Sequence, residues 1–350
     1  MSVTLSPGQK KQVNAQIQPF LAYLETEASR GDEEDRLRRI RYFREELPAR
    51  LKNLSEADVA EMVSQLWASR IWGNKQYLVQ KVIEDNGLDS LRDELRHLLD
   101  RTVSPPARYE RALLRIRRLG PACVTEILCY SDADNCGIWN ERARAAVGKL
   151  GLGGFVSPEK YMLTGSEYST FNSLLRVIGK ELGAAGIPDV DLLKVDFFLY
   201  NVGAGETPPT PRGGFDHDEI RDLIESIGAM LGFDAQTEVV VAHGAKVDVV
   251  WRARIGNLGT VTYVFEVHKA GSIDSLVLNL QKAKSGPTVQ KVIAVSDQEQ
   301  LNKIEAETDG LPEEFRRSLA FWRVTEVQEV GEHLRLASES INRLGLVPGI

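Results

Sequence analysis

The sequence predicts a multidomain protein in which helical segments precede a segment of mixed helices and strands. Two observations predict this fold class. Up to about Leu119, apolar residues recur three and four positions apart, whereas beyond Gly214 valine-rich runs alternate with helical patterns. A run of prolines and glycines over residues 203–214 suits neither a helix nor a strand. At roughly 100–200 residues per domain, we expect helical domains at 1–104 and 105–205 and an α/β domain with a C-terminal extension at 206–350.

The first segment has the signature of a helical bundle. Ser55 followed three residues later by Asp58 predicts a capping box at a helix start. The apolar residues with helical spacing are Leu51, Leu54, Val59, Met62, Val63, Leu66 and Trp67. Ser104-Pro105-Pro106 breaks the pattern, because proline cannot donate a main-chain hydrogen bond.

The last segment follows the order helix, three strands, helix, strand. Asp216–Leu231 is amphipathic and is followed by Gly232, which predicts a helix with a glycine at its end. The next predicted elements are strands at 238–242, 246–255 and 260–269, a turn at 256–259, a helix at 273–284, a strand at 289–295 and a helix near Gln298.

Composition excludes several classes of protein. With 350 residues, 43% hydrophobic residues and a net charge of −7, the chain is neither disordered nor a basic, histone-like protein that coats nucleic acid. We expect no membrane segment and a cytoplasmic location, because apolar runs of about 18 residues and a signal-peptide core are missing. The spacing of Cys123, Cys129 and Cys136 favours reduced thiols over a zinc site.

Two acidic residues stand among apolar residues in adjacent predicted strands. Asp248 lies in Lys246–Val250 and Glu266 in Val264–His268. Buried acids are costly without partners, and a hairpin would bring these two together. Two carboxylates with water and carbonyl oxygens make a site for Mg²⁺ (or Mn²⁺). Taken singly, Asp248 is equally explained by a turn cap or by a pair with Arg252, and Glu266 by a satisfied strand acid opposite Lys246.

Residues 216–304 resemble the restriction-endonuclease-like, or PD-(D/E)xK, nuclease superfamily. The resemblance implies an αβββαβ core in which Asp248 and Glu266 bind the metal ion. It also implies a helix acid, Glu219 in preference to Glu225, and a helper residue, Gln281.

One residue departs from the motif of that superfamily. His268 stands at the lysine position of Glu-x-Lys, and a neutral histidine supplies no fixed cation near pH 7. Lys246 shares a strand face with Asp248 and is the candidate for a migrated lysine, whereas Lys269 is expected to point away. His268 by itself is more often a structural residue than a catalytic one.

Residues 119–128 and 136–144 resemble the helix-hairpin-helix region of DNA glycosylase-like proteins. In that motif a glycine turn at a helix N-terminus binds a DNA phosphate. Asn140 stands where many relatives carry an aspartate, so no glycosylase activity is expected. A purely structural helical domain explains the same residues.

Arginines are concentrated between Arg101 and Gly120, where six stand against one acid, Glu110. The predicted DNA-binding residues are Arg108, Arg111, Arg115 and Arg118. A basic face of this kind neutralises phosphates and makes binding sensitive to salt. A solvated helix or an acidic protein partner explains the same cluster.

These observations lead to a Mg²⁺-dependent DNA endonuclease as the first hypothesis, in restriction or anti-phage defence. It would act as a homodimer or together with other proteins of a defence system. The second hypothesis is a catalytically inactive nuclease-fold protein that binds nucleic acid or serves in an assembly. The third is a protein-binding helical scaffold with an α/β end.

Overall fold

The structure, a computed structural model, describes residues 3–71, 75–204, 215–242, 245–254 and 259–342. Most of the predicted linker (205–214) and of the predicted turn (256–258) lies outside these residues. The contacts divide the chain into two compact units, one with the described residues up to Ala204 except Ile71, the other with those from Phe215 onward. The first unit is helical and the second holds a five-stranded mixed sheet, which confirms the predicted mixture of helical and α/β parts.

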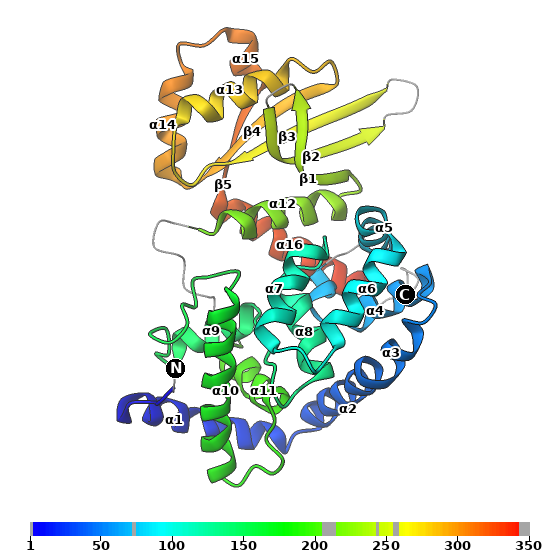
Figure 1. The fold of residues 1–350 in the computed structure, drawn as a ribbon. Helices are drawn as coiled ribbons and strands as arrows, with labels where there is room; N and C mark the ends of the chain where they lie inside the picture. Colours follow the sequence, from blue (N-terminus) through cyan, green and yellow to red (C-terminus); the bar gives the residue numbers. More distant parts are fainter. Residues whose placement is uncertain (1–2, 72–74, 205–214, 243–244, 255–258, 343–350) are drawn as a thin grey trace. The chain divides into compact units, whose positions relative to one another are not determined.

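The first unit is built from the α-helices that are coloured from blue to green in Figure 1. They are α1 (Pro7–Leu24), α2 (Glu27–Arg41), α3 (Leu47–Arg50), α4 (Glu56–Gln65), α5 (Lys75–Asn86), α6 (Leu88–Leu99), α7 (Pro105–Arg115), α8 (Pro121–Ser131), α9 (Glu141–Lys149), α10 (Gly165–Ala184) and α11 (Leu192–Val202). The predicted capping box of α4 is confirmed, because Ser55 and Asp58 each accept a main-chain hydrogen bond from the other. Pro105 and Pro106 occupy the first turn of α7, where a missing N–H costs nothing.

The core of the first unit surrounds α8, whose side chains are buried almost throughout. Phe171 and Trp139 meet edge to face at 4.9 Å within this core. Cys123, Cys129 and Cys136 are buried free thiols. Burial raises the pKa of Cys136 to about 12, so this thiol stays protonated.

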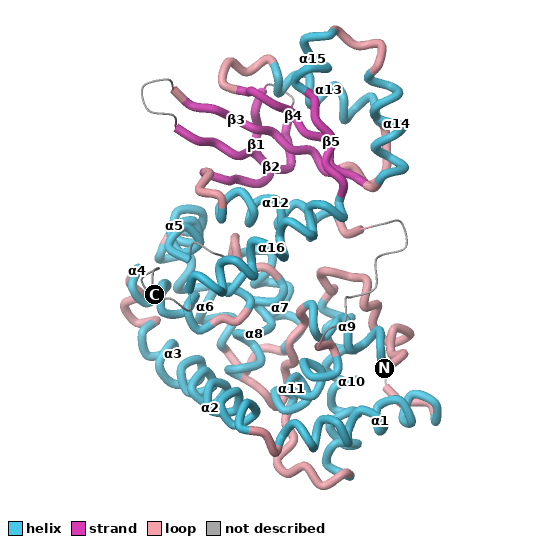
Figure 2. Tube along the Cα trace, turned by 180° about the vertical axis from the view of Figure 1, so that it is seen from behind, coloured by secondary structure: helices cyan, strands magenta, loops and turns pink. Residues whose placement is uncertain are grey.

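The second unit is a sheet between two helical layers (Figures 1 and 2). Its elements are α12 (His217–Met230), β1 (Asp234–Ala242), β2 (Ala245–Arg254), β3 (Thr260–Val267), α13 (Ile273–Lys284), β4 (Val289–Ser296), α14 (Gln298–Thr308), α15 (Glu313–Ser318), β5 (Leu319–Arg323) and α16 (Val324–Asn342). The strand order is β1-β2-β3-β4-β5. Pairs β1/β2 and β2/β3 are antiparallel, and β3/β4 and β4/β5 are parallel.

Each face of the sheet has its own apolar cluster. Ile224 and Ile227 of α12 pack with Trp251, Phe265 and Val327 on one face. On the other face, α13, α14 and α15 pack against residues of β2, β3 and β4. Within the described residues, no helix combines the length and apolar character needed to cross a membrane.

Candidate metal-binding site

Asp248 and Glu266 meet where β2 and β3 move apart. The β2–β3 ladder runs from the Arg254/Thr260 pair to the Val249/Phe265 pair and ends there. Beyond it, the Asp248 N–H donates to Oε2 of Glu266 at 3.3 Å, and the Val267 N–H donates to Oδ2 of Asp248 at 2.7 Å. The two carboxylates thus take the place of ladder acceptors, and a hydrogen bond also joins them to each other. The predicted convergence of the two acids is therefore present.

Each helical layer sends one polar side chain to this pair. From α13, Nδ2 of Asn279 donates to Oε1 of Glu266 at 3.2 Å. From the first turn of α12, Nε2 of His217 lies 3.3 Å from Oδ2 of Asp248. The other ring nitrogen of His217, Nδ1, lies 3.4 Å from Oδ1 of Asp218. The pair is therefore held from both sides of the sheet.

The electrostatics of the pair are those of two carboxylates with one proton between them. Burial and the neighbouring charge of Asp248 raise the pKa of Glu266 to about 8. Burial opposes ionisation of Asp248, but hydrogen bonds led by that from His217 hold its pKa below the usual value. Hydrogen bonds to Asp218 and Asp248 raise the pKa of His217 to about 10, so its imidazole is a cation at neutral pH.

The predicted helper residues lie in different surroundings. Glu219 is in the first turn of α12, where its N–H donates to the capping Asp216, and Glu225 is buried further along that helix. Lys246 is 59% exposed and pairs with Glu238 of β1. Its ammonium group is therefore engaged by the edge strand. Among the described residues, the side chain of Gln281 makes no polar contact, and Asn279 of the same helix reaches Glu266 instead.

His268 lies just beyond β3 and is held by β4. Its N–H donates to the Val295 carbonyl at 2.8 Å, and its own carbonyl accepts a hydrogen bond from Ser296. The imidazole is buried, and its Nε2 has no hydrogen-bond partner within the described residues. Burial lowers the pKa of His268, although the Asp297 charge opposes this shift, so the ring is neutral at pH 7. The histidine that contacts the carboxylate pair is thus His217.

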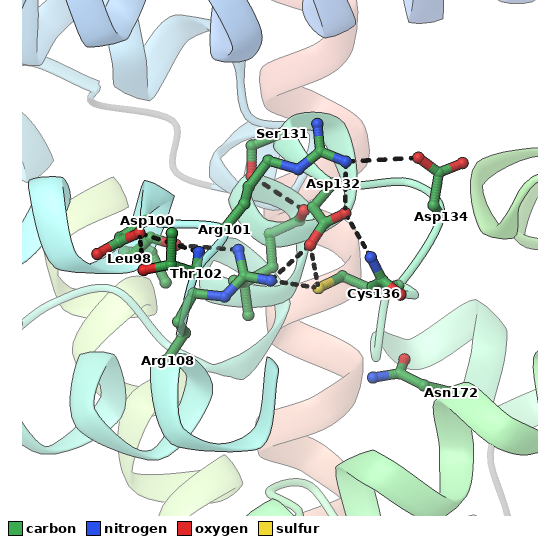
Figure 3. Close-up of polar contacts among 12 residues, drawn as sticks. Leu98, Asp100, Arg101, Thr102, Arg108, Ser131, Asp132, Asp134, Cys136 and Asn172 are labelled. Carbon is green, nitrogen blue, oxygen red and sulfur yellow. Dashed lines mark hydrogen bonds and ion pairs between the residues drawn. The ribbon is translucent and has the colours of Figure 1, made fainter. Parts of the chain in front are cut away.

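The predicted basic face on α7 is only partly formed. Arg108 is fully buried and pairs with Asp132 at 2.6 Å, with Cys136 beside it (Figure 3). Arg108 therefore does not face solvent. Its guanidinium neutralises a buried carboxylate instead. Arg111 pairs with Glu94 through two hydrogen bonds of 2.7 and 3.1 Å, and Arg118 pairs with Asp85.

Arg115 differs from the other three arginines. It is exposed and has no ion-pair partner among the described residues. An open cavity of about 490 Å³ beside it is lined by Glu94, Ala107, Glu110, Arg111, Leu114 and Arg115. Arg111 and Arg115 are therefore the two predicted cations that remain accessible.

The helix-hairpin-helix-like residues have identifiable structural roles. Gly120 precedes α8 without a side-chain cap, and a Cβ there would come 3.0 Å from the Tyr161 hydroxyl. Asn140 caps α9, since its Oδ1 accepts a hydrogen bond from the Ala143 N–H at 2.9 Å. These contacts account for both residues as parts of the fold.

The donor atoms at the pair fit a hard divalent cation. Carboxylate oxygens are the ligands that Mg²⁺ prefers, and a cation would relieve the repulsion that keeps a proton on Glu266. Within the described residues, no three His, Cys, Asp or Glu side chains already surround one point, so main-chain carbonyls and water would complete the shell. No protein-family model, curated protein or solved structure matches the chain.

Two residues of the site, His217 and Asn279, were not predicted from the sequence. Asn279 carries a signal, because it lies three residues after Leu276 and four before Ala283, both buried against the sheet. Gln281 is offset from that face. The only sequence feature of His217 is its position next to the N-cap Asp216, and this position does not indicate which strand its ring contacts.

Proposed function

We propose that this protein is a Mg²⁺- or Mn²⁺-dependent nuclease that hydrolyses DNA phosphodiester bonds. The observation that carries the proposal is the meeting of Asp248 and Glu266 at the point where β2 and β3 separate. The order α12-β1-β2-β3-α13-β4 supports a restriction-endonuclease-like core. A role in restriction or defence, and action as a homodimer or with other proteins, belong to the same proposal.

Asp248 and Glu266 would hold the ion. When bound, such an ion activates water and stabilises the charge that develops on the phosphate. The chain's own contribution is orientation. The Val267 N–H fixes Oδ2 of Asp248, and Asn279 fixes Oε1 of Glu266. These contacts hold the carboxylates in place before a substrate arrives, which is the kind of preorganisation that hydrolysis requires.

A second candidate is a nuclease-fold protein that binds nucleic acid without cleaving it. The observation that favours it is that neither His268, at the motif's lysine position, nor Lys246, the candidate for a migrated lysine, supplies a cation to the pair. His268 is neutral and buried, and Lys246 is engaged with Glu238. His217 is the cation in contact with Asp248. Cleavage therefore depends on whether His217 can supply the positive charge that the lysine supplies in the motif.

The test is a plasmid-nicking assay with Mg²⁺ and with Mn²⁺. Wild type should convert supercoiled DNA to open circles, and Asp248→Ala should lower the rate at least about 100-fold. The control is Asp274→Ala, an exposed carboxylate in the first turn of α13, which should keep the wild-type rate. Salt-sensitive DNA binding without cleavage of any DNA form would favour the second candidate. Absence of both binding and cleavage would remove both.

A further inference from the structure

His217 lies between two carboxylates at the start of α12. Its Nδ1 lies 3.4 Å from Asp218, and its Nε2 lies 3.3 Å from Asp248. Asp218 is itself held by Nη1 of Arg221 at 2.8 Å. The ring is therefore oriented by one carboxylate and directed at the other.

Neither the capping nor the dipole of α12 explains why a histidine occupies position 217. The α12 N-terminus is capped by Asp216, whose side chain accepts a hydrogen bond from the Glu219 N–H at 3.1 Å. A cation in the first turn is disfavoured by the helix dipole, which favours acids there. The contacts with Asp218 and Asp248 are therefore what hold an imidazole at this position.

The contact with Asp248 selects one of its two oxygens. Oδ2 lies 3.3 Å from Nε2 of His217 and accepts a hydrogen bond from the Val267 N–H at 2.7 Å. A carboxylate oxygen has about two lone-pair positions, so these two donors saturate it. Oδ1 is then the oxygen of Asp248 left for other ligands, whether the Glu266 carboxyl or an ion. Removing the imidazole would leave the Val267 N–H as the donor on Oδ2, beside the hydrogen bond between the two carboxyl groups.

We propose that His217 is a positioning residue for the metal site, which presents Oδ1 of Asp248 to the ion by holding Oδ2. The inference rests on the proposed function, since it takes the ion to lie at the Asp248–Glu266 pair. Groups that orient a metal ligand without touching the metal typically change affinity about 10- to 100-fold when they are removed. His217 acts through Asp248 and is not itself placed among the ligands.

The test measures Mn²⁺ affinity of the full chain from the electron paramagnetic resonance signal of free Mn²⁺. His217→Ala should weaken binding about 10- to 100-fold. His217→Gln, whose amide nitrogen can donate at nearly the same place, should recover at least part of the loss. His333→Ala, an exposed histidine in α16, should leave the affinity at the wild-type value. Asp218→Asn, which keeps the imidazole but weakens its support, should give a smaller loss.

The outcomes separate the two proposals. Wild-type affinity in His217→Ala, with Mn²⁺ bound and DNA cleaved, would overturn the role of His217 and leave the nuclease standing. A His217-dependent Mn²⁺ site without cleavage of DNA would overturn the nuclease and support the role of His217. Failure of wild type to bind Mn²⁺ would overturn both. Thermal unfolding of each variant shows that it is folded, and if His217→Ala does not fold, the Gln and Asp218 variants decide.

Discussion

At the scale of single residues, the proton on Glu266 couples the site to pH. Burial and the charge of Asp248 raise the pKa of Glu266 to about 8 in the metal-free protein. A metal ion requires the ionised carboxylate, so its binding releases that proton. Affinity for Mn²⁺ should therefore rise about tenfold per pH unit below about pH 8 and level off above it.

Titrations with Mn²⁺ between about pH 6 and about pH 9 measure this dependence. Glu307→Gln, an exposed residue of α14, is the matched control and should follow the wild-type curve. An affinity that does not change over this range would mean that Glu266 is already ionised or is not a ligand.

The two carboxylates could be predicted from the sequence, but their partners could not. An acid among apolar residues in a strand indicates a buried charge. The alternation of side chains along the two strands places Asp248 and Glu266 within reach of each other. Which helical side chain meets them depends on how α12 and α13 lie on the sheet. That is why His217 and Asn279 were missed, and why Lys246 was assigned to a site that it does not contact.

At the scale of the element, the close approach of α12 to the sheet depends on Gly228. A Cβ at this position would come 2.4 Å from Nε1 of Trp251. The same Nε1 donates to the Ile224 carbonyl at 3.0 Å, so the indole is held in place. Gly228→Ala should therefore displace α12 and lower the free energy of unfolding by about 1–3 kcal/mol.

Urea denaturation measures this cost, and Mn²⁺ affinity should fall in parallel, because α12 carries His217. The control is Gly310→Ala, where a Cβ would meet open space. Equal stability of Gly228→Ala and wild type would show that α12 can shift without loss.

Replacement of the buried Arg108 should lower stability, whereas replacement of the exposed Arg115 should weaken DNA binding. Arg108→Ala leaves Asp132 without its closest cation in a buried site and should cost about 3–5 kcal/mol of unfolding free energy.

Arg115→Ala should leave stability unchanged and weaken DNA binding. The slope of log affinity against log salt should fall by about 0.9 if Arg115 neutralises one phosphate.

Urea denaturation and fluorescence anisotropy with labelled DNA at several salt concentrations measure these two effects. The inverse result, a stable Arg108→Ala and an Arg115→Ala with unchanged DNA binding, would contradict both assignments.

Elements with strong periodicity could be predicted from the sequence, and those defined by tertiary pairing could not. The predicted helices at 216–231 and 273–284 correspond to α12 and α13. In contrast, β1 starts at Asp234, four residues before the predicted strand, because Ala235 and Gln236 pair with Trp251 and Val250. The short strand β5 exists through its parallel pairing with β4 and has no sequence pattern of its own.

At the scale of the whole molecule, the contacts divide the chain into two compact units, and the three domains expected from the sequence stay a prediction. The predicted break at Ser104-Pro105-Pro106 lies at the N-terminus of α7, which packs against α6 and α8. Prolines suit both a linker and the first turn of a helix, and the sequence does not distinguish these uses. The net charge of −7 does not exclude the proposed DNA substrate, because a metal ion at the proposed site would offset acids locally.

Anomalous scattering from crystals grown with Mn²⁺ shows whether Asp248 and Glu266 together bind one divalent ion. We expect a single anomalous peak that both carboxylates contact at about 2.0–2.2 Å, with Oδ2 of Asp248 still bound by His217 and the Val267 N–H. The contradictory result is a fully Mn²⁺-loaded crystal with no peak at this position and the two carboxylates still hydrogen-bonded to each other.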